Sequence, residues 1–276
     1  MVAAKRGPQQ PQPKTVFDDL PRQTVEFYLQ AMKILDRSGV PYLVGGAYAL
    51  AYYAGIVRHT KDFDTFVRDQ DVDKALRAFD EAGYRTEKTH PHWVAKAFSN
   101  SNDDPDFVDL IYGSGNGICP VDDAWFDHSV DGELLGRSVR LCPVEEMIWS
   151  KSFVMERNRF DGADIQHLLL ARADTIDWRH LIARFQGHER VLLAHLVLFN
   201  YVYPSERGSV PASVIDALIS KLKSEPPEAE SVCRGTLLSW KEYLPDVQQR
   251  GMEDARLQPR GNLTPQQIAR WTAAEK

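Results

Sequence analysis

The sequence predicts an α+β protein in which a mixed β-sheet domain is followed by a helical C-terminal domain. Short apolar strands alternate with amphipathic helices up to residue 142, and helical patterns dominate from Pro143 onward. A hydrophobic fraction of 43% over 276 residues is sufficient for the cores of two modest domains. We therefore expect a flexible tail over residues 1–14, a sheet domain over 15–142 and a helical domain over 143–276.

The first residues differ in composition from the rest of the chain. Residues 1–14 are rich in proline and glutamine and contain too few apolar groups to offset the entropy of ordering. From Pro21 onward apolar residues recur at helical spacing, and Gly39 provides a helix stop. This first helix is expected to pack on the sheet that follows.

The stretch 42–67 carries the strongest functional signal. A short apolar strand ends at Gly45 and Gly46, an alanine-rich helix runs to Gly55, and the next strand contains Asp62 and Asp64. Alternate residues of a strand share a face, so these carboxylates should lie roughly 5–7 Å apart. Two like charges at that separation repel, unless divalent cations with a preference for oxygen ligands lie between them.

The two glycines supply a second feature. A Gly-Gly turn lets the backbone approach a bulky anion closely, and the N–H groups that open the following helix point toward that anion. Phosphate is the expected ligand. A phosphate cradle followed by a metal-binding acidic pair is the arrangement that nucleotidyl transfer requires.

The other elements of the sheet domain follow from periodicity and turn residues. We expect a helix over residues 72–83, strands over 92–98 and 107–112, and an edge strand over 138–141. The loop over residues 113–117 should lie beside the mouth of the active site.

Asp109 lies inside the otherwise apolar run 107–112, where an isolated buried carboxylate would be costly. The cost is understandable if Asp109 shares metal ions with Asp62 and Asp64. The alternative is that Asp109 faces solvent on a half-exposed strand. The apolar residues Phe107 and Ile111 share its face of the strand and favour the metal interpretation.

The run Gly45-Gly46 followed by Asp62-Phe63-Asp64 resembles the signature of the nucleotidyltransferase superfamily that includes DNA polymerase beta. Arg58-His59-Thr60-Lys61, just before the acidic pair, resembles the bacterial branch of lincosamide-type antibiotic nucleotidyltransferases and abortive-infection toxin nucleotidyltransferases.

This resemblance implies an enzyme that moves a nucleoside monophosphate from a nucleoside triphosphate to an acceptor hydroxyl and releases pyrophosphate. It implies two Mg²⁺ ions held by Asp62, Asp64 and Asp109, and triphosphate contacts from Gly45 and Gly46 and from Arg58, Thr60 and Lys61, although an exposed loop would tolerate the last three equally. The acceptor is a small molecule such as an antibiotic, or tRNA. For a toxin of this branch, an antitoxin would be a partner.

A helix is expected to begin at Pro143, and Lys151 falls on its apolar face. The lysine either snorkels to solvent or neutralises the triphosphate. Related enzymes resemble this chain in carrying such a lysine before an arginine-rich turn and paired aspartates, here Asp161 and Asp164. The resemblance implies that at least one of these aspartates orients Lys151 or activates the acceptor as a general base. The alternative is that Asp161 is the N-cap of the next helix and Asp164 lies in its first turn.

Further helices are expected over residues 178–185, 189–203, 214–222 and 232–243. Residues 248–276 are polar and charged, with Trp271 as an anchor.

Composition narrows the class of protein. The net charge of −6 argues against general nucleic-acid coating, and the three separated cysteines fit a reducing cytoplasm. Lys5 and Arg6 are not followed by the apolar segment of a secretory signal, and the longest apolar run is far too short for a membrane span. We therefore expect a soluble protein. The acidic balance favours a small cationic acceptor, whereas the long helical half favours a larger one. A hypothesis from another class is a catalytically silent nucleotide-binding regulatory or scaffold protein of the same fold.

Overall fold

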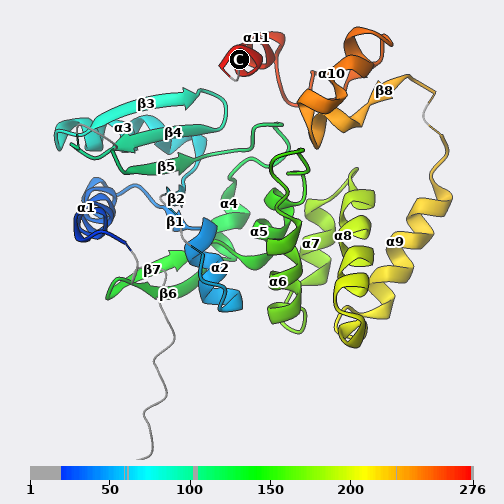
Figure 1. Cartoon of the computed structure of the whole chain (residues 1–276), viewed down its shortest axis with the longest axis horizontal. Coiled ribbons are helices and arrows are strands. Elements are labelled where there is room, and N and C mark those ends of the chain that lie inside the picture. Colours follow the sequence, from blue (N-terminus) through cyan, green and yellow to red (C-terminus); the bar gives the residue numbers. More distant parts are fainter. Residues whose placement is uncertain (1–19, 59, 61, 102–104, 228, 275–276) are drawn as a thin grey trace, which may run out of the picture.

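The computed structural model describes residues 20–58, 60, 62–101, 105–227 and 229–274 (Figure 1). The predicted flexible tail over residues 1–14 lies outside this part of the chain. Within it, a mixed β-sheet comes first along the chain and a largely helical region follows, as the sequence predicts. The division into separately folding domains at Pro143 stays a prediction.

The main sheet has seven strands in the order β3-β4-β5-β2-β1-β7-β6. It is mixed, because β2 pairs with β5 and β1 with β7 in parallel, while the other neighbours are antiparallel. The strands are β1 (Leu43–Val44), β2 (Asp62–Phe66), β3 (Arg85–His90), β4 (Val94–Phe98), β5 (Phe107–Ile111), β6 (Val130–Leu134) and β7 (Arg137–Leu141). The pair of parallel strands β2 and β5 lies in the interior of the sheet.

Two helices cover one face of this sheet. Helix α1 (Arg22–Ser38) begins after Pro21 and ends at Gly39, whose φ of +64° suits glycine. Helix α3 (Val72–Glu81) follows a short 3₁₀ turn. Together with the inward side chains Phe63, Val108 and Leu110, these helices form one hydrophobic core.

The opposite side of the sheet is covered by α2 (Gly46–Ala54), α4 (Asp123–Asp127) and the helices that follow the sheet (Figure 1). A second core is continuous from α2 through these later helices, so it crosses the position of Pro143. No helix in the described part of the chain is long and apolar enough to cross a membrane. The later helices are α5 (Val144–Lys151), α6 (Gly162–Arg172), α7 (Trp178–Arg184), α8 (Glu189–Val202) and α9 (Ala212–Ser224).

The remaining segment returns to the sheet. It contains β8 (Val232–Cys233), α10 (Trp240–Gln248), β9 (Glu253–Asp254) and α11 (Pro265–Ala274). A small core of Trp240, Leu263 and Trp271 holds the segment together, and Trp271 is buried as the predicted anchor.

Two predictions of secondary structure are wrong, and two edge strands were not predicted. Strands β3 and β6 were not predicted, because their sequences are mostly polar and exposed at the two edges of the sheet. Strand β7 was predicted at an edge, but it pairs with both β1 and β6. The helix predicted over residues 232–243 begins only at Trp240, because Val232 and Cys233 pair with β9.

Candidate active site

Strands β2 and β5 bring the predicted carboxylates together. Asp64 and Asp109 are direct partners in the parallel pairing, so their side chains lie on the same face of the sheet. Asp62 precedes Asp64 by two residues and shares that face. The intervening Phe63 is fully buried on the other face. The structure therefore places all three acids on one face, while their role as metal ligands stays a prediction.

The Gly45-Gly46 turn lies directly against this acidic face. Gly45 donates its backbone N–H to the backbone oxygen of Asp64 at 3.1 Å. Gly46 has a φ of +55°, and a Cβ added there would lie 1.7 Å from Asp64 Oδ2. Only glycine permits this approach. The N-terminus of α2, with its positive dipole end, thus opens onto the same space as the carboxylates.

The pKa values of Asp64 and Asp109 show that their negative charges are costly in this position. Burial, and then the charge of Asp109, raise the pKa of Asp64 to about 6. Burial also raises the pKa of Asp109. A cation beside Asp64 would relieve both the burial of its charge and the repulsion from its neighbour.

These residues fit a divalent cation that is completed by a ligand. Magnesium is commonly held by one or two carboxylates together with phosphate oxygens rather than by an all-protein cage. Within the described ranges, no three His, Cys, Asp or Glu side chains converge closely enough to hold an ion by themselves. Asp64 and Asp109 would hold the ion, with Asp62 beside them at the more exposed end of β2.

Lys96 on β4 is a feature that the sequence interpretation missed. Its Nζ lies 2.8 Å from Asp109 Oδ1, and the two residues are direct partners in the antiparallel pairing. The ammonium group also lies 3.5 Å from the centroid of the Phe107 ring. The alternation of Val94-Ala95-Lys96-Ala97-Phe98 would have revealed it, had the hairpin register been known.

Lys151, the last residue of α5, lies in an ionic cluster. Its Nζ lies 3.0 Å from Asp161 Oδ2 and 2.9 Å from Asp164 Oδ2. Arg159 contacts Asp161, and Arg58 pairs with Asp164. Burial acts to lower the pKa of Lys151, but the two aspartates outweigh it and raise this pKa, so the lysine stays charged.

The cluster also bears on the alternative interpretations of the paired aspartates. Asp161 occupies the position before α6, but its side chain makes no capping hydrogen bond. Its carboxylate instead accepts a hydrogen bond from Lys151. This geometry agrees with an orienting role, and the role of either aspartate as a general base stays a prediction.

Of the three residues before β2 that were predicted to contact the triphosphate, the structure describes Arg58 and Thr60. Thr60 Oγ1 accepts a hydrogen bond from the backbone N–H of Asp62 at 3.1 Å, which fixes the entry into the strand. The Arg58 side chain is 42% exposed and engaged with Asp164. Lys61 lies outside the described residues.

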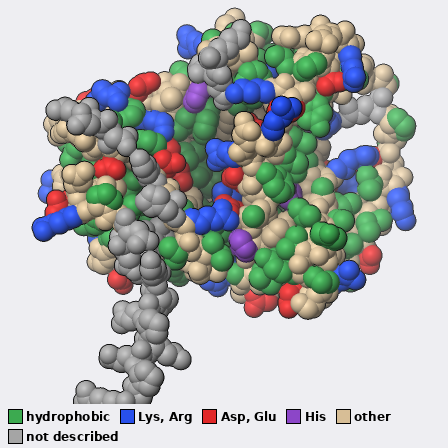
Figure 2. All heavy atoms as spheres, in the orientation of Figure 1, with side chains coloured by type: hydrophobic (Ala, Val, Ile, Leu, Met, Phe, Trp, Pro, Cys, Tyr) green, Lys and Arg blue, Asp and Glu red, His purple; other side chains and the backbone are tan. Residues whose placement is uncertain are grey.

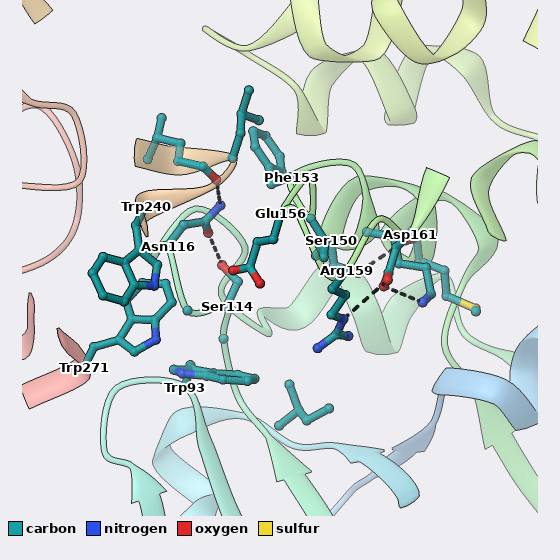
Figure 3. A pocket seen from close by; sticks show the side chains of 18 of the residues that line it. Trp93, Ser114, Asn116, Ser150, Phe153, Glu156, Arg159, Asp161, Trp240 and Trp271 are labelled. Atoms are coloured by element: carbon teal, nitrogen blue, oxygen red, sulfur yellow. Dashed lines mark hydrogen bonds and ion pairs between the residues drawn. The ribbon is translucent and has the colours of Figure 1, made fainter. Parts of the chain in front are cut away.

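A pocket of about 250 Å³ lies between Asp64 and the ionic cluster around Lys151 (Figure 3). Gly46 and Asp64 line one end, and Lys151 and Arg159 line the side formed by α5 and the loop after it. Figure 2 shows a hollow on this face of the molecule, between the sheet and the later helices. The pocket therefore holds the Asp64 carboxylate together with the positive charge of Lys151 and Arg159.

The far wall of the pocket is aromatic. Trp93, Trp240 and Trp271 lie across the pocket from Arg159 (Figure 3). The 113–117 loop lines the pocket as predicted, and its Asn116 donates a hydrogen bond to the backbone oxygen of Leu237 at 2.7 Å. The returning C-terminal segment is thereby fastened beside the site.

No protein-family model matches the sequence, and the search of curated proteins found no match. Several solved structures are similar. The antibiotic-resistance factor ANT(2'')-Ia is 18% identical with a TM-score of 0.42, and the match covers 64% of this chain and 98% of that chain. The lincosamide antibiotic adenylyltransferase LnuA, solved with lincomycin bound, is 14% identical with a TM-score of 0.37, over 55% of this chain and 98% of its own.

A third similar structure is an antigenic nucleotidyltransferase-like protein from Paracoccidioides brasiliensis. It is 15% identical with a TM-score of 0.42, over 70% of this chain and 95% of its own.

Proposed function

We propose that the protein is a Mg²⁺-dependent nucleotidyltransferase, which moves a nucleoside monophosphate from a nucleoside triphosphate to an acceptor hydroxyl and releases pyrophosphate. The observation that carries the proposal is the register of β2 and β5. It puts Asp64 and Asp109 side by side, and Asp64 lies directly against Gly46 at the N-terminus of α2. A phosphate cradle in contact with paired carboxylates is what transfer at a phosphorus atom requires.

The residues of the chain have distinct roles in this reaction. The backbone N–H groups that open α2 at Gly46 receive the phosphates, Gly45 forms the turn that brings them there, and Lys151 neutralises charge from the side of α5. Asp64 and Asp109, with Asp62, would hold the metal, which when bound lowers the pKa of the acceptor hydroxyl and neutralises the departing pyrophosphate. The acceptor oxygen forms its bond to the α-phosphorus as the bond to pyrophosphate breaks.

The pocket supports a small acceptor. Its volume of about 250 Å³ suits a compact molecule, and Glu156 on its wall suits a cationic one. We therefore place a small hydroxylated cationic molecule, such as an antibiotic, ahead of tRNA. Transfer to tRNA, and an antitoxin as a partner, stay predictions.

A labelling experiment tests the proposal. The purified protein is mixed with Mg²⁺, each α-labelled nucleoside triphosphate, a panel of antibiotics and total tRNA. Label on a drug supports the small acceptor, and label on RNA supports the larger one. Asp64→Asn should abolish transfer, whereas Asp127→Asn, at an exposed position of α4, should leave it unchanged. Full transfer by Asp64→Asn would contradict the proposed metal site.

One observation favours the silent alternative. The ion pair with Lys96 already neutralises Asp109, as it would in a protein that binds nucleotide and transfers nothing. In that case the labelled triphosphate would bind the protein, and neither pyrophosphate nor a labelled acceptor would form with any member of the panel.

A further inference from the structure

Lys96 belongs to the acidic face itself. Neighbouring strands β4, β5 and β2 align Lys96, Asp109 and Asp64 in one row, because each is the direct partner of the next. Their side chains therefore project from the same face of the sheet. A cation of the protein stands where the metal ligands are expected.

The position of this ammonium group is well defined. Its Nζ lies 2.8 Å from Asp109 Oδ1 and 3.5 Å from the centroid of the Phe107 ring. Asp109 Oδ1 is buried from solvent, and the Lys96 side chain is only 22% exposed. Contacts to a carboxylate and to a ring face hold the lysine on the acidic face, where an unattached lysine would extend into water.

We propose that Lys96 takes the place of one of the two cations in the two-metal scheme, so that the protein binds a single divalent ion, beside Asp64. The charges support this. Asp62, Asp64 and Asp109 carry three negative charges, which one divalent ion and one ammonium group neutralise completely. In the nucleotide-free protein, a second divalent ion would have to displace Lys96 from Asp109 Oδ1 and would bring an excess of positive charge.

Lys96 acts through Asp109 and is in that sense a positioning residue. The catalytic meaning of this inference rests on the proposed function, but ion binding does not require transfer. The test is therefore a titration of the nucleotide-free protein with Mn²⁺, in which electron paramagnetic resonance measures the free ion. The wild-type chain should bind one ion.

Two variants of Lys96 should shift Mn²⁺ affinity in opposite directions. Lys96→Met removes the competing charge and should tighten binding by about tenfold. Lys96→Arg should weaken binding, because a guanidinium can engage both oxygens of Asp109. The control is Lys88→Met, which removes an equal charge and a lysine–aspartate pair from the neighbouring strand β3. It should leave the affinity unchanged.

The outcomes separate the inference from the proposed function. Two ions on the wild-type chain, or equal Mn²⁺ affinity in wild type, Lys96→Met and Lys96→Arg, would overturn the role of Lys96. If Asp64→Asn still abolished Mn²⁺ binding, the proposed metal site would nevertheless stand. No Mn²⁺ binding by any variant would overturn the inference and the metal site together. Thermal melts of each variant establish that it is folded, and the Arg variant keeps the positive charge if the Met variant does not fold.

Discussion

Replacing Gly46 by alanine tests the contact between the glycine turn and the acidic face. The added Cβ would lie 1.7 Å from Asp64 Oδ2, whereas such contacts essentially never fall below 3.0 Å. The carboxylate, or the start of α2, must therefore move by at least 1.3 Å to bring 1.7 Å up to 3.0 Å. Because Gly46 also has a φ of +55°, alanine adds backbone strain of about 1–2 kcal/mol.

The two costs predict two separate effects. A displacement of about 1 Å at a reacting centre costs on the order of a hundredfold in rate. We therefore expect Gly46→Ala to lose at least that factor in pyrophosphate release and to bind Mn²⁺ more weakly. The backbone strain should lower the melting temperature by about 2–8 °C, at roughly 2–4 °C for each kcal/mol in a protein of this size.

Gly55 provides a matched control at the other end of the same helix. Its φ is +67°, and a Cβ added there would meet no atom within 4 Å. Gly55→Ala should therefore show the loss of stability without the loss of transfer. Equal activity in the two alanine variants, or wild-type activity in Gly46→Ala, would refute the proposed contact between the turn and the acidic face.

Three other predictions concern the rest of the pocket. Lys151→Met removes the cation that Asp161 and Asp164 share, while Arg159 and Arg58 remain, and should cost about 1.5–3 kcal/mol of unfolding free energy in urea; Lys151→Arg should recover most of it. Burial acts to raise the pKa of Asp161, but Lys151 and Arg159 hold this pKa below its ordinary value. The ion pair therefore stabilises the fold fully above the ordinary carboxyl pKa, and this stabilisation is lost as the pH falls through the lowered pKa. Asp161→Asn should thus cost about 1.5–3 kcal/mol at neutral pH and progressively less in acid melts, and a constant difference would contradict the ion pair. Trp271→Ala should expose the last helices to trypsin in limited proteolysis, whereas Tyr201→Ala, at an exposed position, should not.

The positions that the sequence predicted, and that the structure brings together, have local signals. Gly45 and Gly46 interrupt an apolar strand just before a helix, and this combination announces a turn without knowledge of the rest of the chain. Asp109 stands out because its neighbours are apolar. Its pairing with Asp64 then follows from the alternation of side chains along two adjacent strands.

The parts that were missed depend on contacts between distant segments. From the sequence alone, Lys96 has the pattern of a solvent-facing strand residue. Its contact with Asp109 follows only from the register of β4 and β5. Trp240 and Trp271 reach the pocket only because the last segment folds back over the loop around Asn116. Nothing in the composition of either segment indicates that return.

The continuous core beneath α2 has a consequence for how ligands reach the pocket. Tyr53 donates a hydrogen bond to the backbone oxygen of Cys142, and Arg172 donates one to the backbone oxygen of Tyr53. These bonds connect α2 both to the end of the sheet and to α6. A hinge there would have to expose a large dry interface. In the described part of the chain, the opposite wall is held by the small core of Trp240, Leu263 and Trp271 with a few partly buried neighbours, and by the hydrogen bond from Asn116 to Leu237. We therefore expect substrate entry and product exit to proceed by local opening of the wall that has the smaller core.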